Sequence, residues 1–194
     1  MPDKKLSNNL DRFANLVNQE GTSPKPSKIP ERYNKLAEAV GGKVVIRQAG
    51  TYCLVKTTYP FEYTHGNFGL GDADTRKIPV SAFTALDEQG TADVRRMLFI
   101  DTETTGLGGA GVVAFLVGCG SIKRHGFEVR QYLLPDYSDE TAMLEDLLEE
   151  LTPEKTLVSY NGAAFDLPLL RDRMILNRVA RKIDCEHHLD MLHS

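Results

Sequence analysis

One stretch decides the fold of this 194-residue chain: Arg96-Met-Leu-Phe-Ile-Asp-Thr-Glu-Thr-Thr-Gly-Leu107. Its first part, from Met97 to Ile100, is a continuous apolar run, which is typical of a strand covered on both faces. Asp101 and Glu103 follow two positions apart, and alternate residues of a strand point to the same face. We therefore expect two carboxylates to converge at the end of a buried strand.

Two carboxylates in such a place resist burial unless a cation neutralises them, because each negative charge raises the pKa of the other group. Carboxylate oxygens are hard ligands that suit Mg²⁺ or Mn²⁺. The alternative is a strand that runs out into a solvated acidic turn, and a bare Asp-x-Glu favours that alternative. A partner carboxylate elsewhere in the chain is needed to shift the balance.

Composition predicts one globular domain with additional segments. Hydrophobic residues make up 41% of the chain and the net charge is −4, so any nucleic-acid binding must depend on local basic patches. Cys53, Cys119 and Cys185 form no Cys-x-x-Cys pair, which favours a reducing compartment. The N-terminus lacks the apolar segment of a signal peptide, and the apolar run 112–117 is too short to cross a membrane. We therefore expect a cytoplasmic protein.

The chain divides into three expected parts. Residues 1–30 predict a short amphipathic helix over 6–18 and a proline-rich linker, and we expect this part to be partly disordered. Residues 31–90 form an accessory segment, and residues 91–194 form the main domain.

The accessory segment predicts a helix over 31–40, followed by strands over 43–47 and 52–57 that pair as a hairpin. The stretch 59–74 that follows is rich in aromatic residues and glycine. These aromatics either pack the accessory segment onto the main domain, which we favour, or stack on bases.

The loop Gly106-x-Gly108-x-x-Gly111 has the letters of a dinucleotide-binding fingerprint, but that motif requires a helix to open at the loop. Here the next segment, 112–118, is rich in β-branched and aromatic residues and predicts a strand. We therefore expect a flexible turn between antiparallel strands, and no NAD-type oxidoreductase.

The remaining elements complete an order of β-β-β-α-β-α. A third strand is predicted over 127–134, and a helix begins at Ser138 as its capping residue and stops at Pro153. A strand over 156–160 follows, and then a second helix after Asn161. The buried stripe of the first helix consists of Leu144, Leu147, Leu148 and Leu151.

Asp166 is the partner carboxylate, because it lies in the first turn of the second helix, just past a strand end. The alternative is a negative charge that only complements the helix dipole. Asn161 before it and Pro168 after it favour a shaped site.

Two motifs resemble those of a known group of enzymes. Asp101-Thr-Glu103-Thr-Thr-Gly-Leu and Tyr160-Asn-Gly-x-x-Phe-Asp166 resemble the first two motifs of the DEDD 3′→5′ exonuclease superfamily. Further segments resemble the YprB-type ribonuclease H-like exonuclease domain in particular, and the resemblance covers roughly residues 40–194. These segments are Tyr59-Pro, Tyr63-x-His-Gly66, Phe115-Leu-Val-Gly118, Arg171-x-Arg173 and His188-Leu-Asp-Met-Leu-His193.

The resemblance implies an α/β fold: a ribonuclease H-like mixed sheet flanked by helices, with a small N-terminal helix and hairpin extension. In that superfamily four acids hold two divalent ions, Mg²⁺ or Mn²⁺, at the 3′ end of DNA or RNA. Asp101 would bridge both ions, Glu103 would bind the ion that carries the attacking water, and Asp166 would bind the second ion. The implied substrate-binding residues are Thr102, Thr104, Thr105, Gly106, Leu107 and Asn161.

The chain departs from the superfamily at its C-terminus. The fourth acid and the general base belong downstream of the His188 segment, whereas the sequence ends at Ser194, and neither Asp184 nor Asp190 matches the missing acid. We therefore expect an incomplete nuclease domain with weak or no activity. The alternative is a non-catalytic nucleic-acid-binding module.

Two weaker patterns complete the candidates. The spacing of one cysteine and three histidines near the C-terminus matches no common zinc site; they are Cys185, His187, His188 and His193. Five basic residues either contact the phosphates of a nucleic acid or form a solvated helix face; they are Arg171, Arg173, Arg178, Arg181 and Lys182.

Overall fold

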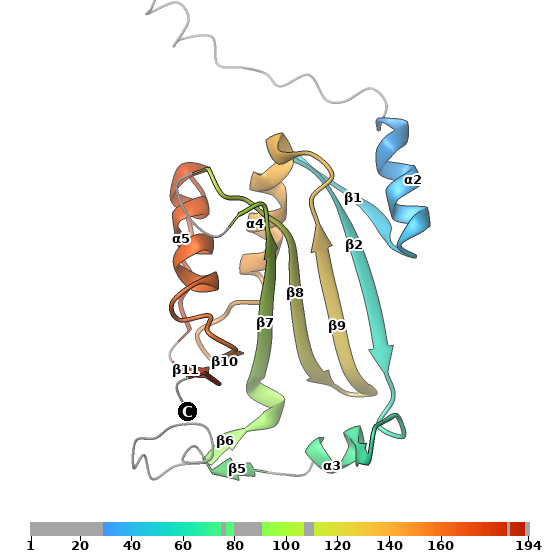
Figure 1. Cartoon of the computed structure of the whole chain (residues 1–194), viewed down its shortest axis with the longest axis vertical. Helices are drawn as coiled ribbons and strands as arrows, with labels where there is room; N and C mark the ends of the chain where they lie inside the picture. Colours follow the sequence, from blue (N-terminus) through green and yellow to red (C-terminus); the bar gives the residue numbers. More distant parts are fainter. Residues whose placement is uncertain (1–28, 75–76, 80–90, 107–110, 186, 193–194) are drawn as a thin grey trace, which may run out of the picture.

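The computed structural model describes residues 29–74, 77–79, 91–106, 111–185 and 187–192. Seven strands form one mixed sheet in the order β1-β2-β9-β8-β7-β10-β11 (Figure 1). The strands from β1 to β7 in this order pair antiparallel, whereas β7, β10 and β11 run parallel. The strands are β1 (Lys43–Arg47), β2 (Gly50–Tyr59), β7 (Met97–Thr104), β8 (Ala114–Lys123), β9 (Gly126–Leu133), β10 (Thr156–Ser159) and β11 (His187–Asp190).

Three helices accompany this sheet: α2 (Glu31–Ala39), α4 (Glu140–Leu148) and α5 (Asp166–Leu176). The chain therefore runs β7-β8-β9-α4-β10-α5, which confirms the predicted β-β-β-α-β-α order and the α/β class. The predicted strand over 112–118 begins at Ala114 and is longer than expected. Gly111 precedes it as predicted, while the glycines at 108 and 109 lie outside the described residues.

The accessory helix and hairpin form as predicted, and the hairpin continues the main sheet. Strand β2 pairs with β1 on one side and with β9 on the other. The helix expected over 31–40 is α2, and Gly41 follows it with a φ of 65°. The helix expected over 6–18 lies outside the described residues.

The start of α4 differs from the prediction. Asp136, and not Ser138, is the capping residue, because its Oδ1 accepts hydrogen bonds from the backbone N–H of Ser138 at 3.1 Å and from its hydroxyl at 2.7 Å. A 3₁₀ turn, η3 (Tyr137–Asp139), then leads into the helix. The predicted leucine stripe is confirmed, since Leu144, Leu147, Leu148 and Leu151 are all buried.

Several short elements between β2 and β7 were not predicted. They are β3 (Thr64–His65), β4 (Phe68–Gly69), α3 (Leu70–Asp74), β5 (Lys77–Pro79), β6 (Thr91–Asp93) and the 3₁₀ turn η2 (Val94–Arg96). Of the aromatic residues in this region, Phe61 lines a cavity on the main sheet while Phe68 is exposed. The contact of Phe61 supports packing of this segment onto the main domain.

The main core lies between the sheet and helices α4 and α5, on one face of the sheet (Figure 1). Leu98 and Ile100 of β7 point into it and meet Leu144 of α4 and Leu170 of α5 among its members. Burial of such side chains supplies the main stabilisation of the fold. In the described part of the chain, no helix is long and apolar enough to cross a membrane.

Candidate active site

Strand β7 carries the first two candidate acids on one face. Asp101 and Glu103 are exposed together with Phe99, while Ile100 on the opposite face is buried. Strand alternation explains this separation. The predicted strand and the same-face placement of the two carboxylates are both confirmed.

The neighbouring strand β8 has glycines opposite these side chains. Gly118 pairs with Asp101, and Gly120 pairs with Phe99. A Cβ atom at Gly120 would lie 2.5 Å from Cζ of Phe127, so the ring of Phe127 lies directly over that glycine. A Cβ atom at Gly118 would have only the carbonyl oxygen of Asp101 within 4 Å, at 3.8 Å, so the sheet is recessed there.

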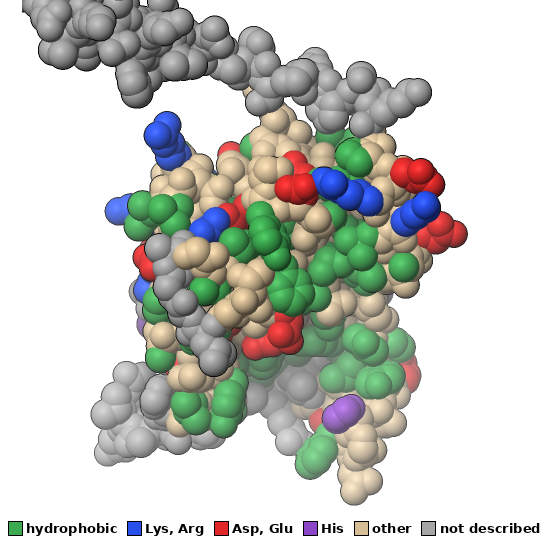
Figure 2. Space-filling view, turned by 45° about the horizontal axis from the view of Figure 1, so that its top comes forward, with side chains coloured by type: hydrophobic (Ala, Val, Ile, Leu, Met, Phe, Trp, Pro, Cys, Tyr) green, Lys and Arg blue, Asp and Glu red, His purple; other side chains and the backbone are tan. Residues whose placement is uncertain are grey.

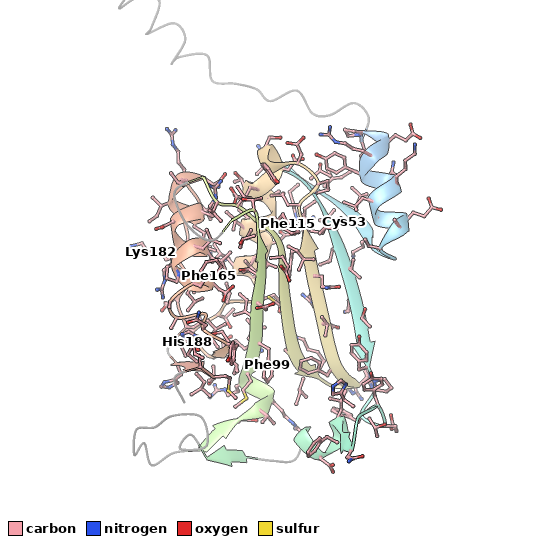
Figure 3. All side chains as sticks on the ribbon, in the orientation of Figure 1. Cys53, Phe99, Phe115, Phe165, Lys182 and His188 are labelled. Atoms are coloured by element: carbon pink, nitrogen blue, oxygen red, sulfur yellow. The ribbon has the colours of Figure 1, made fainter. Side chains whose placement is uncertain are left out.

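A cavity of about 850 Å³ opens over this face of the sheet. Asp101 lies in its wall with Phe99, which is labelled on β7 in Figure 3. Figure 2 shows hydrophobic side chains gathered on the surface with acidic side chains beside them. The other lining residues are mostly apolar and include Phe61, Leu70, Val94, Met97, Ile122, Phe127, Val129, Val158, Tyr160 and Met191.

Asp166, the third candidate acid, is the first residue of α5 and is only 4% exposed. Its Oδ1 accepts a short hydrogen bond from the hydroxyl of Thr102. Burial raises the pKa of Asp166 and the negative charge of Asp101 raises it further, although the bond from Thr102 lowers it in part. A buried carboxylate beside a second carboxylate is the setting in which a cation is most stabilising.

The three acids lie at the same end of the neighbouring strands β7 and β10 but do not form one cluster. Strands β7 and β10 are parallel neighbours, so Asp166, which follows β10, lies at the end of the sheet that carries Asp101. Asp166 is bonded to Thr102, whose side chain alternates away from Asp101 and Glu103. No three His, Cys, Asp or Glu side chains of the described residues are gathered as a metal site. The roles assigned to the three acids stay predictions.

The candidate substrate-binding residues after β7 are held in a shaped turn. The hydroxyl of Thr104 donates to the carbonyl oxygen of Gly106 at 2.7 Å. The N–H of Thr105 donates to the carbonyl oxygen of Val113 at 3.0 Å. The pairing of β7 with β8 is also irregular between Glu103 and Thr104. Such irregularities re-aim side chains near functional sites. Leu107 lies outside the described residues.

Asn161 begins the connection between β10 and α5 with a φ of 62°, an uncommon value for a residue other than glycine. Its N–H donates to Oδ1 of Asp190 at 2.7 Å, and the N–H of Ala163 donates to Oδ2 at 2.8 Å. Although burial raises the pKa of Asp190, the backbone N–H groups of Ala163, Leu192 and Asn161 together lower it. Asp190 therefore caps this turn as well as the residues that follow it.

His188 lies beside β10, and its Nε2 is 2.8 Å from Oγ of Ser159 (Figure 3). Burial lowers the pKa of His188. This contact ties β11 to β10 and gives the histidine a structural partner.

The candidate basic residues do not act as one group. Arg173 binds the buried Glu140 of α4, with Nε 2.8 Å from Oε1, and Arg181 binds Glu149. Arg171, Arg178 and Lys182 are exposed. Two of the five basic residues are therefore ion-paired with α4 or the residue after it, while the other three remain exposed.

Sequence patterns missed two features of the site. The Thr102–Asp166 bond joins residues 64 positions apart and depends on how α5 packs. The recess beside Asp101 had a local signal, because glycines at alternate positions 118 and 120 of a predicted strand leave one face without side chains.

Comparison with known proteins supports the fold and the motif assignment. A family model described as "RNase_H superfamily" matches residues 98–194. The chain is also 33% identical over 168 residues to "Uncharacterized protein YprB" of Bacillus subtilis (strain 168). This match covers 80% of the chain and 38% of the relative, so the chain spans well under half the length of that protein.

Proposed function

Because the chain belongs to the RNase H superfamily, as a YprB-type ribonuclease H-like domain, we propose that it is a metal-dependent 3′→5′ exonuclease domain. Membership indicates a nuclease-like function on nucleic acid. The proposal adds the direction of attack, the dependence on metal and the residues that act.

One observation carries the proposal: Asp101 and Glu103 share the exposed face at the end of β7, and the buried Asp166 lies at the same edge. Burial and the charge of Asp101 raise the pKa of Asp166, so its ionised form is costly to maintain without a cation. Their hard oxygen atoms suit Mg²⁺ or Mn²⁺. The donor set therefore fits a divalent-ion site in its chemistry.

The residues act by binding and orienting. Asp101 and Glu103 would hold a divalent ion on the open face, and Asp166 would give up its bond to Thr102 to hold a second. Such ions supply an activated water and stabilise the leaving oxygen of a phosphodiester displacement. The turn formed by Thr104, Thr105 and Gly106, together with Asn161, would position the terminal nucleotide.

The second candidate is a nucleic-acid-binding module without catalysis. The observation in its favour is that the described residues do not gather three acids into one metal site. Binding would then use the exposed Arg171, Arg178 and Lys182. The free cysteines, of which Cys53 and Cys119 are buried, are compatible with the reducing cytoplasm in either case.

The test is digestion of oligonucleotides labelled at the 3′ end, DNA and RNA in parallel, with Mn²⁺ and with chelator. The proposal expects weak stepwise release from the 3′ end that requires Mn²⁺ and is lost in Asp101→Ala. Asp172→Asn, which changes an exposed carboxylate on α5, is the matched control. Release from the 5′ end, or digestion that survives chelator, would contradict the exonuclease assignment. Oligonucleotide binding without any digestion would support the binding module.

A further inference from the structure

Asp190 contacts the turn before Asp166, although it is not among the acids that the proposed function uses. Its two carboxylate oxygens accept the backbone N–H groups of Asn161 at 2.7 Å and Ala163 at 2.8 Å. The N–H of Leu192 donates to Oδ1 at 3.1 Å and so fixes the carboxylate to the backbone of its own segment. One side chain from β11 thus holds two N–H groups of the connection between β10 and α5.

That connection needs an acceptor of this kind. Asn161 adopts a φ of 62°, and the N–H groups beyond a strand end must find partners outside the sheet ladder. Hydrogen bonds to a charged acceptor are stronger than bonds between neutral groups. The Asp190 carboxylate therefore selects this conformation of the turn.

The position of the turn sets the position of Asp166. A Cβ atom at Gly162 would lie 2.4 Å from Oγ of Ser159 and 3.1 Å from Oδ2 of Asp166, so the turn passes directly against both side chains. The carbonyl oxygen of Gly162 also accepts the N–H of Leu167 at 2.9 Å and starts the first turn of α5. A shift of the turn would move the start of α5 and the carboxylate on it.

We propose that Asp190 is a positioning residue: it holds the turn over 161–163 and so fixes Asp166 at the sheet edge beside Asp101. The inference rests on the proposed function, because it takes Asp166 to be a metal ligand. The inference assigns Asp190 this role and not that of a ligand, because both of its oxygens accept backbone N–H groups of the turn or of its own segment. Residues that orient a ligand in this way change metal affinity by about 10–100-fold when they are replaced.

The first measurement is amide hydrogen exchange in the metal-free protein, for Asp190→Asn and Asp190→Ser. Both changes remove the charged acceptor, so exchange at the N–H groups of residues 161 and 163 is expected to be about 10–100-fold faster. Asp184→Asn, which alters an exposed carboxylate just before β11, is the matched control and should leave both amides unchanged. Unchanged exchange in both Asp190 variants would overturn the proposal.

The second measurement is calorimetric titration with Mn²⁺, with Asp166→Ala in parallel. The proposal expects Mn²⁺ binding about tenfold weaker in both Asp190 variants, and weaker still in Asp166→Ala. Normal Mn²⁺ binding by the Asp190 variants, with binding lost in Asp166→Ala, would overturn this inference and leave the proposed function standing. Normal binding by Asp166→Ala would end the proposed function and this inference with it.

Two further outcomes are decisive. Loss of Mn²⁺ binding in Asp190→Asn with unchanged amide exchange would make Asp190 a ligand and would contradict a positioning role. Failure of both Asp190 variants to fold would show that Asp190 supports the whole sheet edge, and would equally contradict a role confined to the turn.

Discussion

The two faces of the central sheet differ in what covers them. One face packs against α4 and α5, and its residues Leu98 and Ile100 are almost completely buried. The other face carries Phe99 and Asp101 beside glycines of β8, and a cavity of about 850 Å³ lies over it. A single strand, β7, supplies both faces by alternation. Leu98 and Ile100 of β7 therefore contribute to the core, while Asp101 on the opposite face of the same strand is a candidate catalytic residue.

Asp166 links the two faces. It belongs to α5 and the packed face, but it lies at the sheet edge within the electrostatic influence of Asp101. The position of Asp166, the proposed third ligand, depends on the packing of a helix, whereas the positions of Asp101 and Glu103 depend only on the strand. Substitutions of the acids on the open face should therefore lower the activity with little change in the free energy of unfolding. Substitutions on the packed face should mainly lower the free energy of unfolding.

The largest effect is expected for Glu103→Gln on the open face. Loss of a carboxylate that holds an ion removes several kcal/mol of transition-state stabilisation, so nuclease activity should fall about 10³-fold. Because Glu103 is exposed, the free energy of unfolding should change by no more than about 0.5 kcal/mol. Rates of 3′-end release and a urea unfolding curve measure the two quantities. A large loss of stability would show that the open face is also structural.

On the packed face, Arg173→Met should destabilise the protein by about 3–5 kcal/mol, because it leaves the Glu140 carboxylate buried without its guanidinium partner. Nδ2 of Asn177 also donates to Oε2 of Glu140 at 2.6 Å, but this neutral donor does not replace the charge. The double variant Glu140→Met with Arg173→Met should recover most of the loss, as measured by urea unfolding. Equal instability of the single and double variants would refute this account.

A matched pair of truncations compares the faces directly. Leu144→Ala removes a completely buried side chain from the packed face and should cost about 2–5 kcal/mol. Phe99→Ala on the open face removes a ring that is 39% exposed and should cost less, about 1 kcal/mol. Thermal unfolding of the two variants gives the comparison. Equal losses would mean that the cavity face is packed as tightly as the core.

The smallest effect concerns pH. Glu128 lies 2.5 Å from Nζ of Lys56 and 2.8 Å from Nε of Arg130, and although burial raises its pKa, these cations lower it overall. A depressed pKa means that the ionised form stabilises the fold above the ordinary glutamate range and that this contribution disappears as the pH falls. Glu128→Gln should therefore lose about 1 kcal/mol at neutral pH and little in acid. Unfolding curves of both proteins along a pH series test the difference.

Local patterns predicted much of the fold and part of the site. The apolar run of β7 and its alternation placed Asp101 and Glu103 correctly, because both signals lie within one strand. The start of α4 was misplaced, since a 3₁₀ turn precedes the helix and is capped by Asp136, two residues before Ser138. Short capping motifs of this kind look alike in sequence.

Features that depend on distant residues were not predictable. The pairing of β2 with β9 and the bond between Thr102 and Asp166 join positions far apart in the chain. Strand propensity gives no partner for a strand, and a hydroxyl in a strand gives no sign of which helix will meet it. The mixed sheet was predicted only through the motif resemblance.

The hairpin also covers a strand that would otherwise be an edge of the sheet. Strand β2 occupies the long side of β9 over seven residue pairs, from Cys53 with Leu133 to Tyr59 with Phe127. Without it, β9 would present a long row of free backbone donors and acceptors, which is the usual template for edge-to-edge aggregation. The outermost strands are instead β1, of five residues with Lys43 and Arg47 at its ends, and β11, of four residues. Short and charged edge strands of this kind disfavour edge-to-edge pairing.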